Sequence, residues 1–330
     1  MAAPEAAMSK GNDMWRYIAK RLLWLILVLL CAAILIFSIM WFVPGDPAEM
    51  ILSGSGTQAD IDALRERLGL NDPFMVQLGR FLYETFIKFD FGTSYVYMTP
   101  VVDELAVRLP RTFMLGIISI GLSAVIGIPL GVNAAMHRNG FQDQGLLVVC
   151  MLFVSVPQFW LALEMMLLFS QVLGWLPTSG IGTWKHWIMP VIANTISSIA
   201  MNARQARSAV LETSRADFVT TARAKGVHEH NVIWKHMIPN AMIPVVNALG
   251  NSFTAIITST VVIETVFAFP GVGTYMMQAV SGRDYPVVRA CVLMLAVFAA
   301  VVNLGVDLIY AYLDPRIKAQ YVAYGSRKKK

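Results

Sequence analysis

Three histidines and a glutamate lie close together in a polar stretch of this 330-residue chain, and these residue types can bind metal or move protons. The stretch reads TTARAKGVHEHNVIWKHMIPN and runs from Thr220 to Asn240. Its histidines are His228, His230 and His236, and its single carboxylate is Glu229. Because solvated loop histidines are far commoner than ligands and one carboxylate does not complete a ligand set, we expect no metal site here.

Enzymatic chemistry has no better support elsewhere in the chain. No GxxxxGK[ST] pattern occurs, so we expect the chain to hydrolyse no ATP itself. No nucleophile is accompanied by a plausible base, and no CxxC motif or Cys/His cluster suggests zinc. The cysteines, Cys31, Cys150 and Cys291, lie in apolar runs, which argues against a disulfide framework. We therefore expect no catalytic residue, no bound metal and no cofactor held by this chain.

A second group of polar residues lies inside apolar sequence, where such groups are costly and often functional. Glu164 could meet a cationic group of a cargo, or it could pair with a polar residue of a neighbouring subunit. Asn194, Ser197, Ser198 and Asn202 are spaced so that some share a helix face. That face could line a pathway, or it could hydrogen-bond to other helices. The candidate pathway residues are Gln158, Glu164, Asn194, Ser198 and Asn202.

The composition indicates which elements must position these groups. Hydrophobic residues make up 56% of the chain and charged residues only 14%, and the mean hydropathy is +0.59. A soluble domain usually carries about 25% charged residues. The chain is therefore predicted to be an all-α polytopic membrane protein surrounded by lipid. The net charge of +5 does not indicate nucleic-acid binding, because the basic residues cluster beside apolar segments.

Six segments are predicted to span the membrane, since a helix needs about 20 apolar residues to cross the hydrocarbon core. The third is interrupted by VPQ at 156–158, so it could be one kinked span or two short ones. The fourth is diluted by asparagine and serine. The predicted spans are 22–43, 112–136, 144–173, 187–206, 241–263 and 287–312.

Charge favours a single crossing by the third segment. Lys and Arg concentrate at the N-terminus, at the C-terminus and in the stretch 204–235, whereas 45–103 is rich in Asp and Glu. Lysine and arginine mark cytoplasmic loops. A single crossing places both termini and the 207–239 segment inside and the acidic segment outside, in a multi-pass protein of the cell (inner, cytoplasmic) membrane.

The predicted organisation has three parts. Residues 1–14 are expected to form a flexible tail, 15–321 the transmembrane domain, and 322–330 a basic tail. The external segment 45–110 is expected to form a small helical cap, with an amphipathic helix over Asp60–Leu70 ending at a glycine. A further short, non-crossing helix is expected within 264–286, because that stretch contains Pro270, Gly271 and Gly273.

The 207–239 segment is predicted to be a helix–turn–helix on the cytoplasmic side. Good helix formers run from Glu212 to Lys225, and Gly226 can turn the chain with positive φ. A second short helix is expected over His228–Met237, with Pro239 ending it. The hairpin could bind another protein, or its basic residues could meet only lipid headgroups.

Here the sequence resembles a known family. The segment is similar to the "EAA" loop of ABC importer permeases, with Thr220–Thr221–Ala222 in place of Glu-Ala-Ala, then Gly226, and Ile238–Pro239 in place of Leu-Pro. DFVTTARAKGVHEHNVIWKHMIPNAMIPVV is very close to the form found in the "B"-type subunits of the dipeptide/oligopeptide/nickel permease family. The resemblance covers Trp15 to Tyr321, with matching motifs in order: FVPGDPAE, LRERLGLNDPFMVQ, DFGTSY, RLPRTF, SVPQFW, LGWLPTSG, ETVFAFPGVG and RDYPVV.

The resemblance implies a permease subunit that forms half of a translocation pathway for dipeptides, oligopeptides or similar solutes. It implies a heterodimer with a second related permease, two cytosolic ATP-binding subunits that use ATP and Mg, and an external solute-binding protein. The EAA-type loop between the fourth and fifth spans would dock on an ATP-binding subunit. The implied coupling residues are Asp217, Thr221, Ala222, Arg223, Ala224, Lys225, Gly226 and Pro239.

The alternative is a self-contained secondary transporter or channel. Such a protein is expected to show inverted repeats or a mid-membrane charge relay. We find neither in the sequence.

Overall fold

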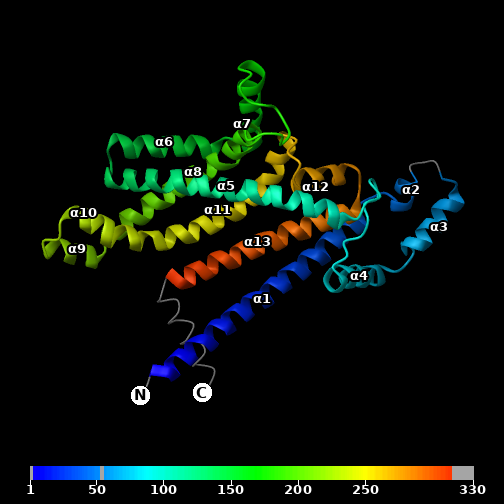
Figure 1. Cartoon of the computed structure of the whole chain (residues 1–330), viewed down its shortest axis with the longest axis horizontal. Coiled ribbons are helices and arrows are strands. Elements are labelled where there is room, and N and C mark those ends of the chain that lie inside the picture. The colour runs from blue at the N-terminus through cyan, green and yellow to red at the C-terminus, as the bar shows by residue number, and fades with distance from the viewer. Residues whose placement is uncertain (1–2, 53–55, 314–330) are drawn as a thin grey trace. The chain divides into compact units, whose positions relative to one another are not determined.

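Apolar helix-forming sequence dominates the chain, and the computed structural model is correspondingly helical (Figure 1). It describes residues 3–52 and 56–313, so the predicted tail 322–330 lies outside the described residues. In the described ranges there is no strand, only an isolated bridge between Thr93 and Pro100. The helices are α1 Ala3–Phe42, α2 Pro47–Ile51, α3 Gln58–Leu68, α4 Phe74–Tyr83, η1 Glu84–Lys88, α5 Val101–Met136, α6 Phe141–Ser155, α7 Gln158–Met165, η2 Met166–Val172, α8 Lys185–Thr213, α9 Asp217–Ala224, α10 Glu229–Asn231, η3 Val232–Met237, α11 Ile238–Val266, α12 Val272–Ser281 and α13 Tyr285–Leu313.

Four stretches of the described helices are long and apolar enough to cross a membrane: Arg21–Phe42, Val101–Met136, Glu229–Val266 and Tyr285–Val306. A fifth candidate is the pair Phe141–Ser155 and Gln158–Val172, which is bent by 94° at the VPQ break. The predicted fourth span corresponds to α8, whose 29 residues extend about 44 Å. Its polar side chains keep it below the apolar threshold, so the structure supports four or five spans of the six predicted.

Several boundaries differ from the sequence-based prediction. Helix α5 begins at Val101 and not at 112, so it takes in the end of the predicted segment 45–110. Residues 3–14, expected as a tail, belong to the long helix α1. The helix expected over 212–225 is broken, because α8 runs on to Thr213 and α9 starts only at Asp217. Pro239 does not end a helix: it lies in the first turn of α11, where its missing N–H is tolerated, and the π-helical turn η3 leads directly into it.

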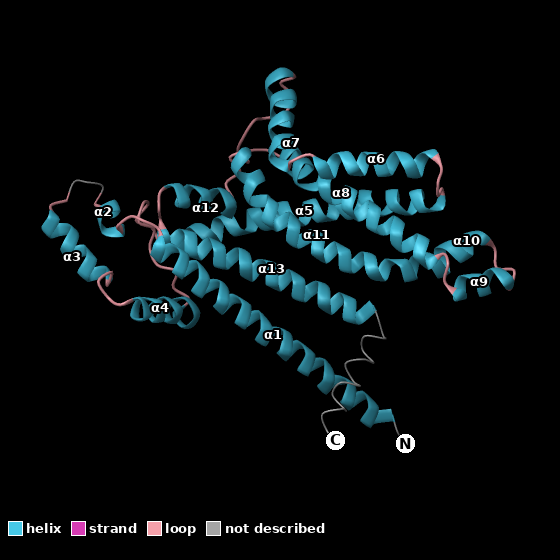
Figure 2. Ribbon diagram, turned by 180° about the vertical axis from the view of Figure 1, so that it is seen from behind, coloured by secondary structure: helices cyan, strands magenta, loops and turns pink. Residues whose placement is uncertain are grey.

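The chain divides into two compact units, the first of which is built mainly from residues 114–269. In it, α8 packs against both α6 and α11, and α6 runs beside α8 in both views (Figures 1 and 2). Glycine permits a close approach of α5 to α8. A Cβ on Gly131 would lie 2.1 Å from the carbonyl oxygen of Ala203, and one on Gly127 would lie 2.8 Å from that of Ile199. Small residues therefore set the helix spacing here, as is usual in membrane bundles.

A buried ion pair joins α6 to α8 in the same unit. The guanidinium of Arg207 donates to both carboxylate oxygens of Asp143, with Nη2 2.8 Å from Oδ2. The Asp143 side chain is 2% exposed and that of Arg207 is 20% exposed. The backbone N–H of Asn139 also donates to Asp143, at 2.9 Å. The pair therefore fixes the start of α6 against the C-terminal part of α8.

We expect Asp143→Ala to destabilise the chain by about 3–5 kcal/mol, because it leaves a largely buried guanidinium without its partner. Thermal unfolding of the detergent-purified chain measures this loss. The matched control is Asp72→Ala, which breaks an ion pair with Arg80 whose side chains are 37% and 43% exposed, and it should cost under about 1 kcal/mol. Equal decreases in unfolding temperature in the two variants would contradict the conclusion that the Asp143–Arg207 pair is buried and stabilises the first unit.

The second unit comprises residues 19–113 and 270–300. The predicted cap helix is confirmed as α3, with Thr57 and Asp60 in a reciprocal N-terminal cap and Gly69 at φ 65° as its C-cap. The helix expected within 264–286 is α12. Asp284 is buried and accepts hydrogen bonds from the Ser94 hydroxyl and from the backbone N–H of Tyr95 (3.0 Å) and Val96 (3.3 Å). That carboxylate ties the loop before α5 to the start of α13.

Candidate functional site

The 207–239 loop projects from one end of the first unit, where α8 ends and α11 begins (Figure 1). The backbone of Gly226 has φ 75°, which confirms the predicted left-handed turn between α9 and α10. Its N–H donates to the carbonyl of Arg223 at 2.9 Å. Apolar residues of the loop are buried in one cluster with α8 and α11: Val219, Ala222, Val232 and Met237 pack with Ala206, Ala209, Val210, Ala241 and Val245. The loop is therefore held firmly on the two helices.

The opposite face of the loop is exposed. Among the coupling residues implied by the resemblance, Ala222 is buried in the cluster just described. The other seven are exposed: Asp217, Thr221, Arg223, Ala224, Lys225, Gly226 and Pro239. The large side chains of Phe218 and Trp234 are also exposed, at 44% and 56%. The structure thus places one buried anchor and a broad exposed surface in this loop.

An ion pair crosses the turn of the loop. Nη2 of Arg223 lies 2.6 Å from Oε1 of Glu229, and this hydrogen bond holds the pKa of the Glu229 carboxyl below its usual range. A carboxyl group whose pKa is lower in the folded state stabilises the fold at pH values above its unfolded-state pKa. That stability is lost as the pH falls through the folded-state pKa. Because the side chains are 44% and 53% exposed, the pair is worth only about 0.2–1 kcal/mol. It orients the turn more than it stabilises the fold.

The histidines of the loop do not converge on a common point. His228 caps α10, since its Nδ1 accepts from the backbone N–H of His230 at 3.3 Å. The ring of His230 lies 6.2 Å from that of Trp234. Within the described residues, no group of three His, Cys, Asp or Glu side chains could hold a metal ion.

A groove with a mixed, mainly apolar surface lies elsewhere in the first unit, with a volume of ≈ 390 Å³. Gln158 and Ser198, two of the predicted pathway residues, line it. The amide of Gln158 donates to the carbonyls of Ala193 (3.4 Å) and Asn194 (3.3 Å), so the residue after the VPQ break is attached to α8. The remaining polar lining comes from Ser197 of α8 and from Asn251, Ser252 and Ser259 of α11.

Asn194 and Asn202 lie behind this groove as links between helices. The Asn194 amide donates to Thr260 at 2.9 Å and accepts from Ser259 at 2.8 Å. Asn202 donates to Ser123 at 3.0 Å and accepts from Ser252 at 2.8 Å. Both asparagines are almost fully buried. Asn194 therefore joins α8 to α11, and Asn202 joins α8 to both α5 and α11. Each asparagine also orients a serine that lines the groove.

Glu164 does not take part in the groove. It lies exposed on α7 and is not among the lining residues. Sequence reasoning missed Asn251, Ser252 and Ser259, although they give α11 the same kind of polar interruption as α8. Their spacing in an otherwise apolar span was the available signal.

Comparison with known proteins agrees with this architecture. The family model for the inner membrane component of binding-protein-dependent transport systems matches residues 127–319, and the model for the N-terminal part of such components matches 14–116. Glutathione transport system permease protein GsiC of Pectobacterium atrosepticum is 38% identical over 305 residues, covering 92% of this chain and 99% of the relative. A Brucella abortus protein assigned by name to a peptide transport system as its permease is 38% identical over 309 residues, covering 91% and 98%.

A solved structure shares the fold. The chain resembles a subunit of the inward-facing MetNI methionine ABC transporter with a TM-score of 0.57 at 20% identity. The match covers 64% of this chain and 97% of that one. At this identity the likeness concerns the fold alone.

Proposed function

The chain belongs to the family of inner membrane components of binding-protein-dependent transport systems, and we propose on this premise that it imports short peptides or similar small solutes. It is a membrane-spanning permease subunit of an ABC importer, and not a self-contained secondary transporter or channel. The observation that carries the cargo assignment is the 38% identity, along nearly the whole chain, to permeases of glutathione transport, because glutathione is itself a small peptide. The groove suits such a cargo, since the amides and hydroxyls within its mainly apolar surface can hydrogen-bond to peptide groups.

We propose a six-span topology in which α8 is the fourth span and the bent pair α6–α7 crosses once. Support comes from the internal pairing of the polar residues of α8, since Asn194 and Asn202 are satisfied by neighbouring helices and need no water. Lys and Arg on the 207–239 loop then face the cytoplasm, as do both termini. The segment 45–110 lies outside.

The exposed face of the 207–239 loop is the proposed docking surface for a cytosolic ATP-binding subunit. Lys225, Arg223 and Asp217 would make polar contacts, and Thr221, Ala224 and Gly226 allow a close approach. Ala222 anchors the loop, and Pro239 begins α11. ATP and Mg are used in partner subunits and not by this chain. A second permease completes the heterodimer, and an external binding protein delivers the solute.

In the pathway, Gln158 and Ser198 are proposed to touch the solute, because they line the groove. Asn194 and Asn202 are proposed to orient the serines that line it. Glu164 is kept as a candidate for contact with the second permease or with a cationic cargo group, since its side chain is exposed on α7.

The topology is tested by labelling lysines with a membrane-impermeant amine reagent. Lys225 and Lys235 are exposed. We expect both to react in inside-out vesicles, but not in cells whose cytoplasmic membrane is intact and whose outer layers admit the reagent. The matched control is Lys88, an exposed lysine of the external segment, which should show the opposite pattern. Labelling of Lys225 from the outside would refute the topology and the coupling role together. Co-purification of an ATPase with the chain is the accompanying test of partnership.

A further inference from the structure

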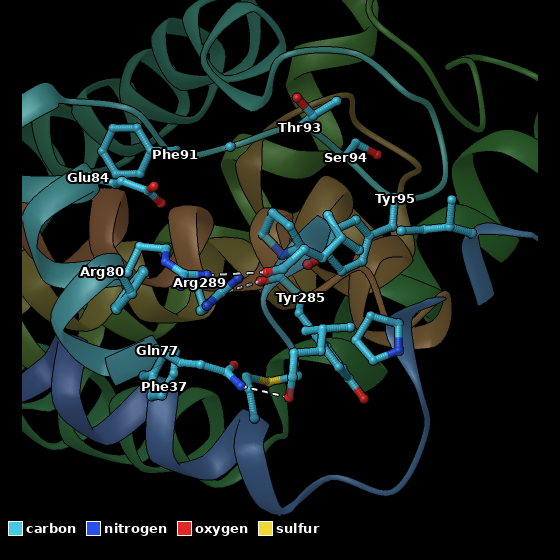
Figure 3. Close-up of a pocket in the computed structure, with 18 of the residues that line it drawn as sticks. Phe37, Gln77, Arg80, Glu84, Phe91, Thr93, Ser94, Tyr95, Tyr285 and Arg289 are labelled. Atoms are coloured by element: carbon cyan, nitrogen blue, oxygen red, sulfur yellow. Dashed lines mark hydrogen bonds between the residues drawn. The ribbon is translucent and has the colours of Figure 1, made fainter. Parts of the chain in front are cut away.

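A second, larger cavity lies wholly within the second unit. Its volume is ≈ 870 Å³, within the range of about 300–1,000 Å³ typical of small-molecule sites. It is lined by the end of α1, by α4 and η1, by the loop after η1 and by the start of α13. Figure 3 shows Gln77, Glu84, Thr93, Tyr95 and Arg289 around it. None of its lining residues belongs to the groove or to the 207–239 loop.

Arg289 is the prominent cation of the cavity. It projects from the first turn of α13, and its Nε donates to the carbonyl of Tyr285 at 3.3 Å. The guanidinium lies 4.9 Å from the ring centroid of Phe81 and 5.6 Å from that of Phe37. Among the described residues, no carboxylate forms an ion pair with it. A guanidinium has five N–H donors in a fixed fork, so most of them remain for a ligand.

One carboxylate near Arg289, that of Asp284, already has its hydrogen-bond partners. Asp284 accepts from Ser94, Tyr95 and Val96. Two other lining cations are also paired, since Arg65 binds Asp46 and Arg80 binds Asp72. These pairs leave Arg289 as a partly buried cation that is available inside the cavity.

Glu84 is the complementary anion. It begins η1, lines the same cavity and is only partly exposed. Within the described residues its carboxylate makes no ion pair, although it attracts the Arg289 guanidinium electrostatically. Arg67 and Asp90, the other charged lining residues, are exposed, and Asp90 accepts from the N–H of Gly92 at 2.8 Å. One cavity thus holds a cation and an anion that attract each other but form no ion pair.

We propose that this cavity binds a small zwitterionic solute, with its carboxylate on Arg289 and its ammonium group on Glu84. Arginine recognises a carboxylate through two parallel N–H donors, and the rings of Phe37 and Phe81 hold the guanidinium in place. Gln77, Thr93 and Tyr95 supply further polar or aromatic contacts. The inference rests on the proposed function for the choice of a peptide as the probe. It adds a site in the second unit that is separate from the groove.

The test is binding of tri-alanine to the full chain in nanodiscs of phosphatidylglycerol, measured by isothermal titration calorimetry without any ATPase. We expect saturable binding that becomes at least about tenfold weaker for the C-terminal amide and for the N-acetylated peptide, because each lacks one charge. Equal affinity for the acid and the amide, or no saturable binding of tri-alanine, would overturn the proposal. If phosphatidylethanolamine nanodiscs abolish binding, the site takes a lipid headgroup and the assignment to a soluble solute is overturned.

Variants of the two charged residues extend the same assay. Arg289→Met and Glu84→Gln should each weaken tri-alanine binding at least about tenfold, while Arg289→Lys should retain part of it, because the charge remains. The matched control is Arg108→Met, since Arg108 also lies over a ring, 4.5 Å from the centroid of Tyr275, but does not line the cavity. Unchanged affinity in Arg289→Met would refute the site. ATP-driven uptake of tri-alanine, measured separately with the partner subunits, distinguishes failure of this site from failure of the proposed function.

Discussion

Gly226→Pro is expected to reduce ATP-coupled uptake to background while the chain still inserts in the membrane. The native φ of Gly226 is 75°, whereas proline fixes φ near −65°. Proline also removes the N–H that donates to the carbonyl of Arg223 at 2.9 Å. The turn between α9 and α10 cannot then form, and the exposed face of the loop loses its shape. Uptake in reconstituted vesicles, together with insertion measured by membrane extraction, checks this result.

Two further variants separate loss of the turn from general damage. Gly226→Ala should lower uptake only a few-fold, because a Cβ at Gly226 meets no atom within 4 Å and the left-handed backbone costs about 1–2 kcal/mol. Gly174→Pro is the matched control: Gly174 has φ 65° and equally open surroundings, but it lies outside the 207–239 loop. Near-normal uptake in Gly226→Pro would show that the loop does not couple uptake to the ATP-binding subunit.

Gly131→Val is expected to prevent recovery of folded chain. A Cβ at this position would lie 2.1 Å from the carbonyl oxygen of Ala203 and 2.8 Å from the Cβ of Ala206. The first atom belongs to the backbone of α8, and the second is an alanine Cβ attached directly to that backbone. Neither atom can therefore move unless the helix moves. Overpacking typically costs about 1–3 kcal/mol, and the contact with a carbonyl oxygen puts this change at or above the upper end. The yield of monodisperse protein and its thermal unfolding measure the effect.

Gly121→Val provides the control on the same helix. Gly121 is exposed and a Cβ there meets nothing within 4 Å, while the change in helix propensity from glycine to valine is the same at both positions. We expect this variant to be recovered with near-native stability. Comparable losses at Gly121 and Gly131 would mean that the close approach of α5 to α8 does not hold the first unit together.

Local signals explain why part of the structure could be predicted. The end of α3 at Gly69 and the turn at Gly226 follow from the freedom of glycine at positive φ, which depends on neighbouring backbone atoms only. The apolar runs likewise report helices of spanning length. The 207–239 loop could therefore be placed and its turn predicted. The continuation of the helix through Pro239 could not be predicted, because the π-helical turn η3 that leads into it has no equally strong local signal.

The candidate groove shows a different limit. Periodicity indicates that Asn194, Ser198 and Asn202 share a face, but it does not say what that face meets. The structure buries the asparagines against Thr260 and Ser123 and leaves Ser198 in the groove. The partners are 66 and 79 residues away in the sequence. No local pattern contains that information.

By itself, the sequence determined that this chain is a helical membrane protein, which stretches of it form long apolar helices, and where a glycine turns the 207–239 loop. These properties depend on hydropathy and backbone sterics over a few adjacent residues. Only the tertiary structure decided the 94° bend at the VPQ break, the burial of Ala222, and the presence of both Arg289 and Glu84 in the lining of one cavity. Those features arise from contacts between distant segments, whose energies depend on three-dimensional packing and not on local residue type.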